Sequence, residues 1–207
     1  KFFSQIIEIL RNFDLFPPII VCLHKYDPDQ KDNPQIEAHI NELKTRFLKH
    51  TDKFQVQFFK TSIFNQYSLN KAFSSGVNAL SPNREILRGQ LKWLSQFSHA
   101  KAMILVDDNN IILSDFSKTE KSRMLSEITA PYFKNLYKTF KDFKFLKQKS
   151  AIWRMDQAFI SFINIKLPNN QIYLLSIHKN EEKDITNLKA KIPEFRERIT
   201  PLIHSYL

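Results

Sequence analysis

Hydrophobic side chains alternate along the first eighty residues between helical spacing and the patterns typical of strands. Pro18–Leu23 is a continuous apolar run that indicates a buried strand, and Phe54–Phe58 alternates as a second strand does. Asn33 and Pro34 predict the cap and first residue of a helix. The predicted order is helix, strand, helix, strand, helix, at residues 1–13, 18–23, 34–47, 54–61 and 68–80. This order is half of a doubly wound α/β domain, with both strand-ending loops at one sheet edge.

Two details of this half are specific enough to be checked. Cys22 is predicted to be a small core residue of the first strand. Ser68 is predicted to cap the third helix. The inward side of that helix is expected to carry Leu69, Ala72, Phe73, Val77 and Leu80.

The second half has a different order of elements. A turn-forming cluster, Asp107–Asn110, joins two short apolar strands. Pro131 is expected to interrupt or restart a long helix, with Thr129 as the new cap. Pro193 and Pro201 are expected to restart or kink the last helix. The predicted elements are helix 84–97, strands 102–106 and 111–116, helix 120–147, strands 151–155, 159–165 and 172–177, and helix 188–206.

Charge is distributed unevenly between the two halves. The chain carries +10 in all, yet residues 1–81 hold ten Lys or Arg against eight Asp or Glu. The second half therefore favours an acidic scaffold or an anionic membrane surface, with nucleic acid as the least favoured partner. Lys134, Lys138, Lys141 and Lys144 form one basic stripe, which is either such a contact or an ordinary solvated face.

Several classes of protein are disfavoured by the composition. One cysteine provides no disulfide framework, and no stretch of the sequence is long and apolar enough to span a membrane. The six His show no metal spacing with Cys or carboxylates, and no Ser, His and Asp grouping is visible. We expect no metal site, no catalytic residue and no secretory leader, and we expect a cytoplasmic location with peripheral membrane recruitment through a scaffold.

The polar tetrad His24-Lys25-Tyr26-Asp27 follows the first strand directly and predicts a base-reading loop. A carboxylate at Asp27 would accept two N–H bonds from the N1 and 2-amino edge of guanine, each worth roughly 1.5–3 kcal/mol. Lys25 would lay its aliphatic stem over the purine face. The alternative is a strand-ending turn with a solvated Lys and Asp.

The tetrad, the later Thr61-Ser62-Ile63 run and the order of elements resemble the carboxyl-terminal half of a Rag/Gtr-family small GTPase. Members of that family carry a roadblock domain after the GTPase domain. The resemblance therefore implies an α/β fold made of a partial P-loop GTPase half-domain, residues 1–82, followed by a roadblock/longin-like α-β-β-α-β-β-β-α domain, residues 83–207. It also implies that GTP or GDP and Mg²⁺ bind the intact parent protein.

The guanine-binding residues implied by the resemblance are His24, Lys25, Asp27, Ser62 and Ile63, the last through its main chain. His24 departs from the Asn common at that position. No G-x-x-x-x-G-K-[S/T] loop occurs in the sequence, and Gly76 and Gly89 both lie in helical contexts. Without the backbone donors and lysine for the phosphates, this chain alone is expected not to hydrolyse GTP and to be a part of a longer protein.

The roadblock resemblance also implies a dimer with a second Rag-like or roadblock protein, identical or different. Its surface would be helix 131–147 with strand Ser150–Asp156. The expected contact residues are Tyr137, Phe140, Lys144, Trp153 and Met155, with a core position for Trp153 as the alternative. Two functions stay open: a nucleotide switch that dimerises and docks on a scaffold, and a roadblock interaction module beside a remnant that never bound nucleotide. A third, a basic nucleic-acid binder, would require steeply salt-dependent binding to DNA or RNA.

Overall fold

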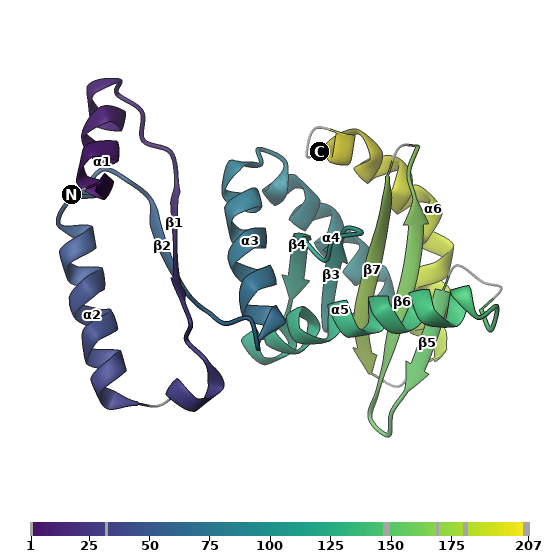
Figure 1. Ribbon diagram of the computed structural model, residues 1–207. Coiled ribbons are helices and arrows are strands. Elements are labelled where there is room, and N and C mark those ends of the chain that lie inside the picture. Colours follow the sequence, from purple (N-terminus) through teal and green to yellow (C-terminus); the bar gives the residue numbers. More distant parts are fainter. Residues whose placement is uncertain (1, 32, 147–149, 169, 180–181, 205–207) are drawn as a thin grey trace. The chain divides into compact units, whose positions relative to one another are not determined.

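The computed structural model describes residues 2–31, 33–146, 150–168, 170–179 and 182–204 (Figure 1). They form two compact units, Lys1–Leu80 and Ser81–Leu207. Among the described residues, the first unit contains a two-stranded sheet, three α-helices and one short 3₁₀ helix, and the second contains a five-stranded sheet and three α-helices.

The first unit is built around two parallel strands, with Ile19 of β1 opposite Val56 of β2 and His24 opposite Thr61. Its α-helices and strands are α1 (Phe2–Asn12), β1 (Ile19–His24), α2 (Pro34–Leu48), β2 (Val56–Thr61) and α3 (Gln66–Leu80), and the short 3₁₀ helix η1 (Pro28–Gln30) follows the tetrad. The predicted cap of α2 is confirmed, because the Asn33 side chain accepts a hydrogen bond from the Gln35 backbone N–H at 3.0 Å.

The prediction that β1 is buried was wrong, and so was the core position of Cys22. Among the described residues β1 pairs with β2 alone, so its other edge has no neighbouring strand. Cys22 is exposed, and the strand contains no fully buried residue. An apolar strand sequence indicates burial only when further strands or helices cover it.

The third helix also differs from its prediction. It begins at Gln66, and Asn65 rather than Ser68 acts as its cap, because the Asn65 Oδ1 atom accepts from the Ser68 backbone N–H at 3.3 Å. Phe73 and Leu80, which were expected to face inward, are 70% and 73% exposed. Ala72 is buried as predicted.

The second unit has an antiparallel sheet in the order β4-β3-β7-β6-β5. The elements are α4 (Arg84–Ser98), β3 (Ala102–Val106), β4 (Ile112–Ser117), α5 (Glu120–Asp142), β5 (Ser150–Arg154), β6 (Ala158–Lys166), β7 (Gln171–Lys179) and α6 (Glu182–His204). This is the roadblock/longin-like α-β-β-α-β-β-β-α order that the sequence predicted. The central strands carry apolar side chains on both sides, since helices cover both faces of the sheet.

Two separate apolar cores result from this sandwich. In one, Leu91 of α4 and Phe195 of α6 pack on Met103 and neighbouring side chains of the sheet. In the other, Tyr137 of α5 packs on the opposite sheet face, with Ile104 of the same strand β3. Alternation along β3 thus assigns Met103 and Ile104 to different cores. Both cores are fully inside the second unit.

Helix α5 is continuous, contrary to the predicted restart at Pro131. Its cap is Thr119, whose hydroxyl oxygen accepts from the Ser122 N–H at 3.2 Å. The Thr129 hydroxyl instead donates to the Leu125 carbonyl at 2.7 Å, within the helix. Buried residues on both sides of the proline pack on one sheet face, and this packing outweighs the roughly 3 kcal/mol that an interior proline costs. Helix α6 likewise continues through Pro193 and Pro201.

Helix α5 also ends five residues before the predicted boundary. Lys144 adopts a left-handed backbone with φ of 61°. The Phe145 N–H donates to the Phe140 carbonyl at 2.8 Å and the Lys144 N–H to that of Lys141 at 3.0 Å, which is the Schellman pattern. The Phe140 and Phe145 rings add the hydrophobic contact of that motif, with centroids 6.4 Å apart.

Candidate functional site

The predicted base-reading loop begins where β1 ends. Lys25 has a left-handed backbone with φ of 64°, which for a non-glycine residue costs roughly 1–2 kcal/mol. The Tyr26 N–H donates to the Thr61 carbonyl at 3.0 Å, so the loop stays attached to the end of β2. Strained backbone that surrounding contacts hold in place is typical of binding loops.

A second contact joins this loop to the loop after β2. The Ser62 hydroxyl donates to Asp27 Oδ1 at 2.6 Å, and the same Ser62 oxygen accepts from the Phe64 N–H at 3.1 Å. Ser62 is 1% exposed and its own N–H donates to the Ser68 hydroxyl at 3.1 Å. The structure therefore brings Asp27 and Ser62 together across 35 residues of sequence and fixes the Asp27 carboxylate from one side.

The other predicted guanine-binding residues lie around this contact. His24 Nδ1 lies 3.3 Å from the Thr61 hydroxyl, a hydrogen bond that ties the two strand ends together. Ile63 follows directly after Ser62, and its side chain is 67% exposed. Lys25 and Asp27 line different pockets, and Tyr26 lines both of them.

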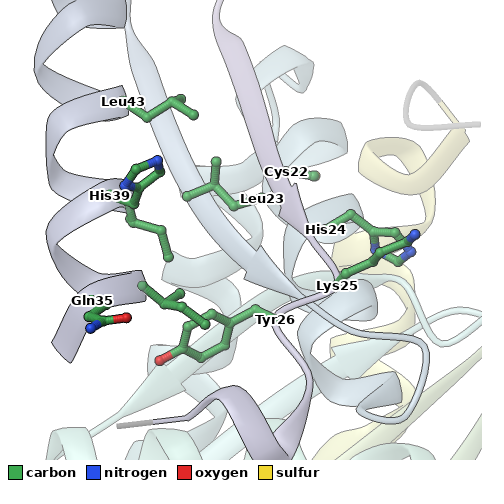
Figure 2. A pocket seen from close by; sticks show the side chains of 10 residues that line it. Cys22, Leu23, His24, Lys25, Tyr26, Gln35, His39 and Leu43 are labelled. Carbon is green, nitrogen blue, oxygen red and sulfur yellow. The ribbon is translucent and has the colours of Figure 1, made fainter. Parts of the chain in front are cut away.

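The pocket beside Lys25 has a volume of about 580 Å³ and lies between β1 and α2 (Figure 2). Leu23 of β1 faces His39 and Leu43 of α2 across it (Figure 2), and His24 and Lys25 also line it, at the end of β1. The pocket beside Asp27 has a volume of about 600 Å³ and lies along β2.

The sequence did not predict a polar triad made by Tyr26 of the loop, Glu37 of α2 and Lys60 of β2. The Tyr26 hydroxyl donates to Glu37 Oε1 at 2.6 Å, and the Lys60 ammonium pairs with the same carboxylate. Lys60, and then the Tyr26 hydroxyl, hold the pKa of Glu37 below its ordinary value, and Glu37 in turn raises the pKa of Lys60. The available signal was Glu37 in the first turn of a predicted helix, a position that favours carboxylates.

The predicted dimer residues are not all on the surface. Tyr137 is 2% exposed and packs on Phe162 and Tyr173 of its own sheet, so its assignment to the dimer surface was wrong. Trp153 is half-buried against Phe133, with ring centroids 4.5 Å apart.

The other three predicted dimer residues are accessible. Phe140 and Met155 are 36% and 51% exposed, and Lys144 is exposed in the turn after α5. Among the described residues β5 pairs with β6 alone, so its outer edge has no neighbouring strand.

An exposed apolar row runs along α5 and extends the predicted surface of helix 131–147 toward the start of the helix. We call it the α5 stripe: Leu125, Ile128, Tyr132, Leu136 and Phe140. The members recur at three or four residues along the helix and are 36–68% exposed. The signal in the sequence was the width of the apolar arc, which exceeds what one buried face requires.

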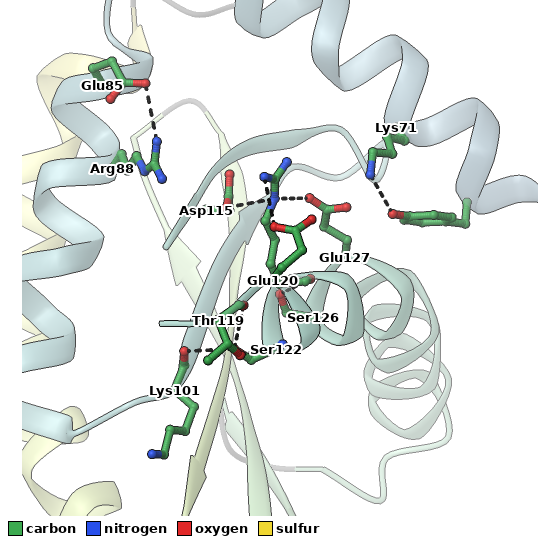
Figure 3. Close-up of polar contacts among 12 residues, drawn as sticks. Lys71, Glu85, Arg88, Lys101, Asp115, Thr119, Glu120, Ser122, Ser126 and Glu127 are labelled. Carbon is green, nitrogen blue, oxygen red and sulfur yellow. Dashed lines mark hydrogen bonds and ion pairs between the residues drawn. The ribbon is translucent and has the colours of Figure 1, made fainter. Parts of the chain in front are cut away.

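Ion pairs hold the amino-terminal turns of α5 on the sheet (Figure 3). Arg123 Nε lies 2.9 Å from Glu127 Oε1 on the same helix and 3.6 Å from Asp115 Oδ2 on β4. Glu127 is 5% exposed and would be costly to bury without this partner. The helix that carries the α5 stripe is therefore held in a defined orientation on its own sheet.

Lys134 was placed in a basic surface stripe by the sequence and is instead buried, with 2% exposure. Its ammonium donates to the Asp108 and Asp107 carbonyls at 2.5 and 3.4 Å and so holds the β3–β4 turn. Lys138 lies 2.8 Å from Asp108 Oδ1, which also accepts from the Tyr173 hydroxyl. Of the four lysines in the predicted stripe, Lys134 and Lys138 thus make contacts within the second unit, whereas Lys141 and Lys144 are exposed to solvent.

Lys134 gives the folding stability a specific pH dependence. Burial, aided by nearby Lys138, lowers the pKa of Lys134 to about 8, whereas an unfolded lysine titrates near 10.4. Between these values the unfolded chain binds one more proton, so the free energy of unfolding should rise with pH from about 8 to 10. Lys134→Met should lack this rise.

Urea unfolding of both chains at pH 7 to 10 measures the difference, and parallel profiles would contradict the prediction. Burial, together with the hydrogen bond to Asp108, raises the pKa of Tyr173, whose opposite contribution begins only above about pH 10.

The chain matches one family of known proteins over much of its length. The Gtr1/RagA G protein conserved region matches residues 1–143, more than half of the chain. No curated protein matches the chain.

Several solved structures resemble the chain at low identity. MglB of Myxococcus xanthus is 15% identical, over 58% of this chain and 90% of MglB, with a TM-score of 0.45. A roadblock/LC7 domain from Streptomyces avermitilis is 12% identical, over 56% and 97%, with a TM-score of 0.47. The gliding protein MglB of Thermus thermophilus is 11% identical, over 60% and 93%, with a TM-score of 0.46. By its match to the conserved region, the chain belongs to the Gtr1/RagA family of G proteins.

Proposed function

We propose that residues of the first unit recognise the base of a guanine nucleotide, GTP or GDP, and that the second unit is a dimerisation module, so that the chain is part of a nucleotide-dependent signalling switch. The single observation that supports base recognition best is the contact between Asp27 and Ser62. It joins the two strand-ending loops and holds a carboxylate at the edge of the sheet where α/β domains bind ligands.

The chemistry of this arrangement favours guanine. An ionised Asp27 accepts hydrogen bonds only, and guanine presents two donors, N1–H and the 2-amino group, on one edge. Ser62 occupies one carboxylate oxygen at 2.6 Å and fixes its direction, while each oxygen retains further lone-pair capacity. Lys25, in its left-handed conformation, would lay its stem on the purine face, and the main chain at Ile63 would meet the base oxygen.

The proposal gives no residue of this chain a catalytic role. The sequence has no Gly-rich loop with a lysine for the phosphates. Within the described part of the chain no three His, Cys, Asp or Glu side chains come together to hold a metal ion. Phosphate binding and hydrolysis therefore belong to the proposal only as properties of a complete GTPase.

The dimer surface consists of the α5 stripe and the open edge of β5. The stripe exposes five large apolar side chains in a row, and an open strand edge beside it offers unpaired backbone groups. A second Rag-like or roadblock chain would cover both. Because this surface does not depend on nucleotide, it also favours the second candidate, an interaction module whose first unit is only a scaffold.

Docking on an acidic scaffold completes the proposal. The second unit carries most of the net positive charge, which favours an acidic partner and, through it, peripheral recruitment to a membrane. No helix within the described ranges has the length and hydropathy needed to cross a bilayer.

A series of nucleosides tests base recognition in this chain directly. Two hydrogen bonds of about 1.5–3 kcal/mol each correspond to a Kd for guanosine on the order of 1 mM. Inosine lacks the 2-amino group and should bind roughly tenfold more weakly, and adenosine more weakly still. Amide shifts at Asp27 and Ser62 in ¹H–¹⁵N spectra measure the affinities. Equal affinity for adenosine and guanosine would leave the interaction module as the better proposal.

A further inference from the structure

The turn that ends α5 exposes two aromatic side chains that the proposed dimer surface does not use. Phe143 and Phe145 are 71% and 77% exposed, more than any member of the α5 stripe. We call residues 141–146 the α5 tip. Figure 1 shows the end of α5 at the margin of the second unit, past the edge strand β5. Large apolar side chains that lie together in water indicate a contact surface.

The backbone of the α5 tip is suited to an apolar medium. The four N–H groups from Phe143 to Leu146 all donate to carbonyls of the last turns of α5, at 2.8–3.3 Å. An unpaired N–H group would be costly to remove from water. Leu146 packs on the core that contains Tyr137 and so fixes the turn to its sheet. Both Phe rings can therefore leave water without carrying unpaired N–H groups of the turn with them.

Positive charge accompanies these rings. Lys141 and Lys144 are exposed, and so is Asp142 between them. Over residues 141–149 the sequence has four lysines and one aspartate, although the last two lysines lie outside the described residues and are counted for charge alone. A lysine can lay its apolar stem along a surface while its ammonium stays at the polar level. Aromatic rings flanked by lysines complement the apolar layer and the negative headgroups of an anionic bilayer.

A protein partner complements the α5 tip less well. A two-fold axis places the same patch on both partners, so a tip-to-tip contact with a second copy would bring Lys141 and Lys144 close to like charges. Such a juxtaposition is unfavourable. An acidic protein surface would pair with the lysines and leave both rings in water. The α5 stripe has no charged member and favours a protein partner, whereas the α5 tip favours an anionic membrane.

We propose that the α5 tip inserts Phe143 and Phe145 into the headgroup region of an anionic membrane, with Lys141 and Lys144 at the level of the lipid phosphates. Stable peripheral binding takes two signals, and the α5 tip combines an apolar one with an electrostatic one. This contact with lipid is direct and needs no scaffold. The proposal requires neither guanine binding nor dimerisation.

Sedimentation with extruded vesicles tests the proposal on the complete chain. The vesicles are phosphatidylcholine with about 30 mol% phosphatidylserine, or phosphatidylcholine alone. The chain should bind the anionic vesicles only, and less when salt is raised from about 0.05 to 0.5 M. Phe143→Ser and Phe145→Ser should each lower the partition coefficient at least about fivefold. Phe13→Ser, at a 72% exposed position of the first unit, should change it less than about twofold.

Charge variants of the α5 tip should act in both directions. Lys144→Gly removes one positive charge and suits the left-handed backbone at φ of 61°, so it should weaken binding about fivefold without destabilising the fold. Asp142→Asn removes the negative charge between the two lysines and should strengthen binding about fivefold. A merely structural role of the turn would not produce this gain. Unfolding midpoints of all variants control for folding.

Two measurements separate a membrane from a protein partner. The fluorescence of Phe143→Trp should be quenched by lipid that is brominated in its acyl chains, beyond any quenching of Trp93 and Trp153 in the unchanged chain. Sedimentation velocity should show unchanged self-association for Phe143→Ser and Phe145→Ser. Equal binding to neutral vesicles, full binding of both Ser variants or an absence of added quenching would overturn the proposal. Loss of self-association in the Ser variants would also overturn it, because the α5 tip would then belong to the dimer surface.

Discussion

Asp27→Ala should abolish the preference of the chain for guanosine over adenosine. The substitution removes both acceptors for the N1–H and the 2-amino group, and hydrogen bonds to a charged partner are worth about 1.5–3 kcal/mol each. The two bonds together correspond to about 3–6 kcal/mol, so the expected loss of guanosine affinity is roughly a hundredfold to ten-thousandfold. Adenosine affinity should change little. The same ¹H–¹⁵N titration measures both nucleosides.

Asp27→Asn supplies the matched control. An amide donates where the carboxylate accepted, so the variant should prefer xanthosine, whose 2-oxo group replaces the 2-amino group of guanosine. A gain for xanthosine with a loss for guanosine assigns the contact to the base edge. If both Asp27 variants bind guanosine like the unmodified chain, the Asp27–Ser62 contact is only structural and the first unit is a scaffold.

Tyr132→Asp and Leu136→Asp should each convert a dimer of this chain, or its complex with a roadblock partner, into monomers. Both side chains belong to the α5 stripe and are 68% and 37% exposed, so the charge disturbs the fold little but would be desolvated in the interface. Central interface residues contribute at least about 2 kcal/mol, which corresponds to a roughly thirtyfold or larger rise in Kd. Sedimentation velocity over a range of concentrations measures the change.

Ile86→Asp is the matched control for this prediction. Ile86 lies on α4, on the other side of the sheet from α5, and is 50% exposed. It should leave the association unchanged. An equal effect of all three substitutions would indicate general destabilisation, and association that survives Tyr132→Asp and Leu136→Asp would place the interface elsewhere.

Much of the candidate site was visible in the sequence because it is local. The apolar run before His24 ends at a loop. Asp27 lies in this loop, three residues after the end of β1, and Ser62 follows β2 directly. Parallel strands bring such loops to one edge, and the register of β1 with β2 does this here. The bond between Asp27 and Ser62 was beyond the sequence, since it depends on how two side chains 35 residues apart are oriented.

The errors had one shared origin, which is that the periodicity of a sequence does not show what covers a face. Tyr137 and Phe140 lie one turn apart on α5, yet the first is in the core and the second at the surface. Lys134 was predicted to be a surface charge. It is buried instead, because its ammonium donates hydrogen bonds to two carbonyl oxygens of the β3–β4 turn. The apolar run that contains Cys22 was predicted to be buried, whereas Cys22 is exposed in the two-stranded sheet.

The sequence by itself determined the order of the elements, the two halves of different type and the position of the base-reading tetrad, because each depends on local spacing and on short runs of residue types. Tertiary structure alone decided that α5 continues through Pro131 and which of its apolar side chains remain outside. These features depend on packing between segments far apart in the chain, where contact energies outweigh local preference.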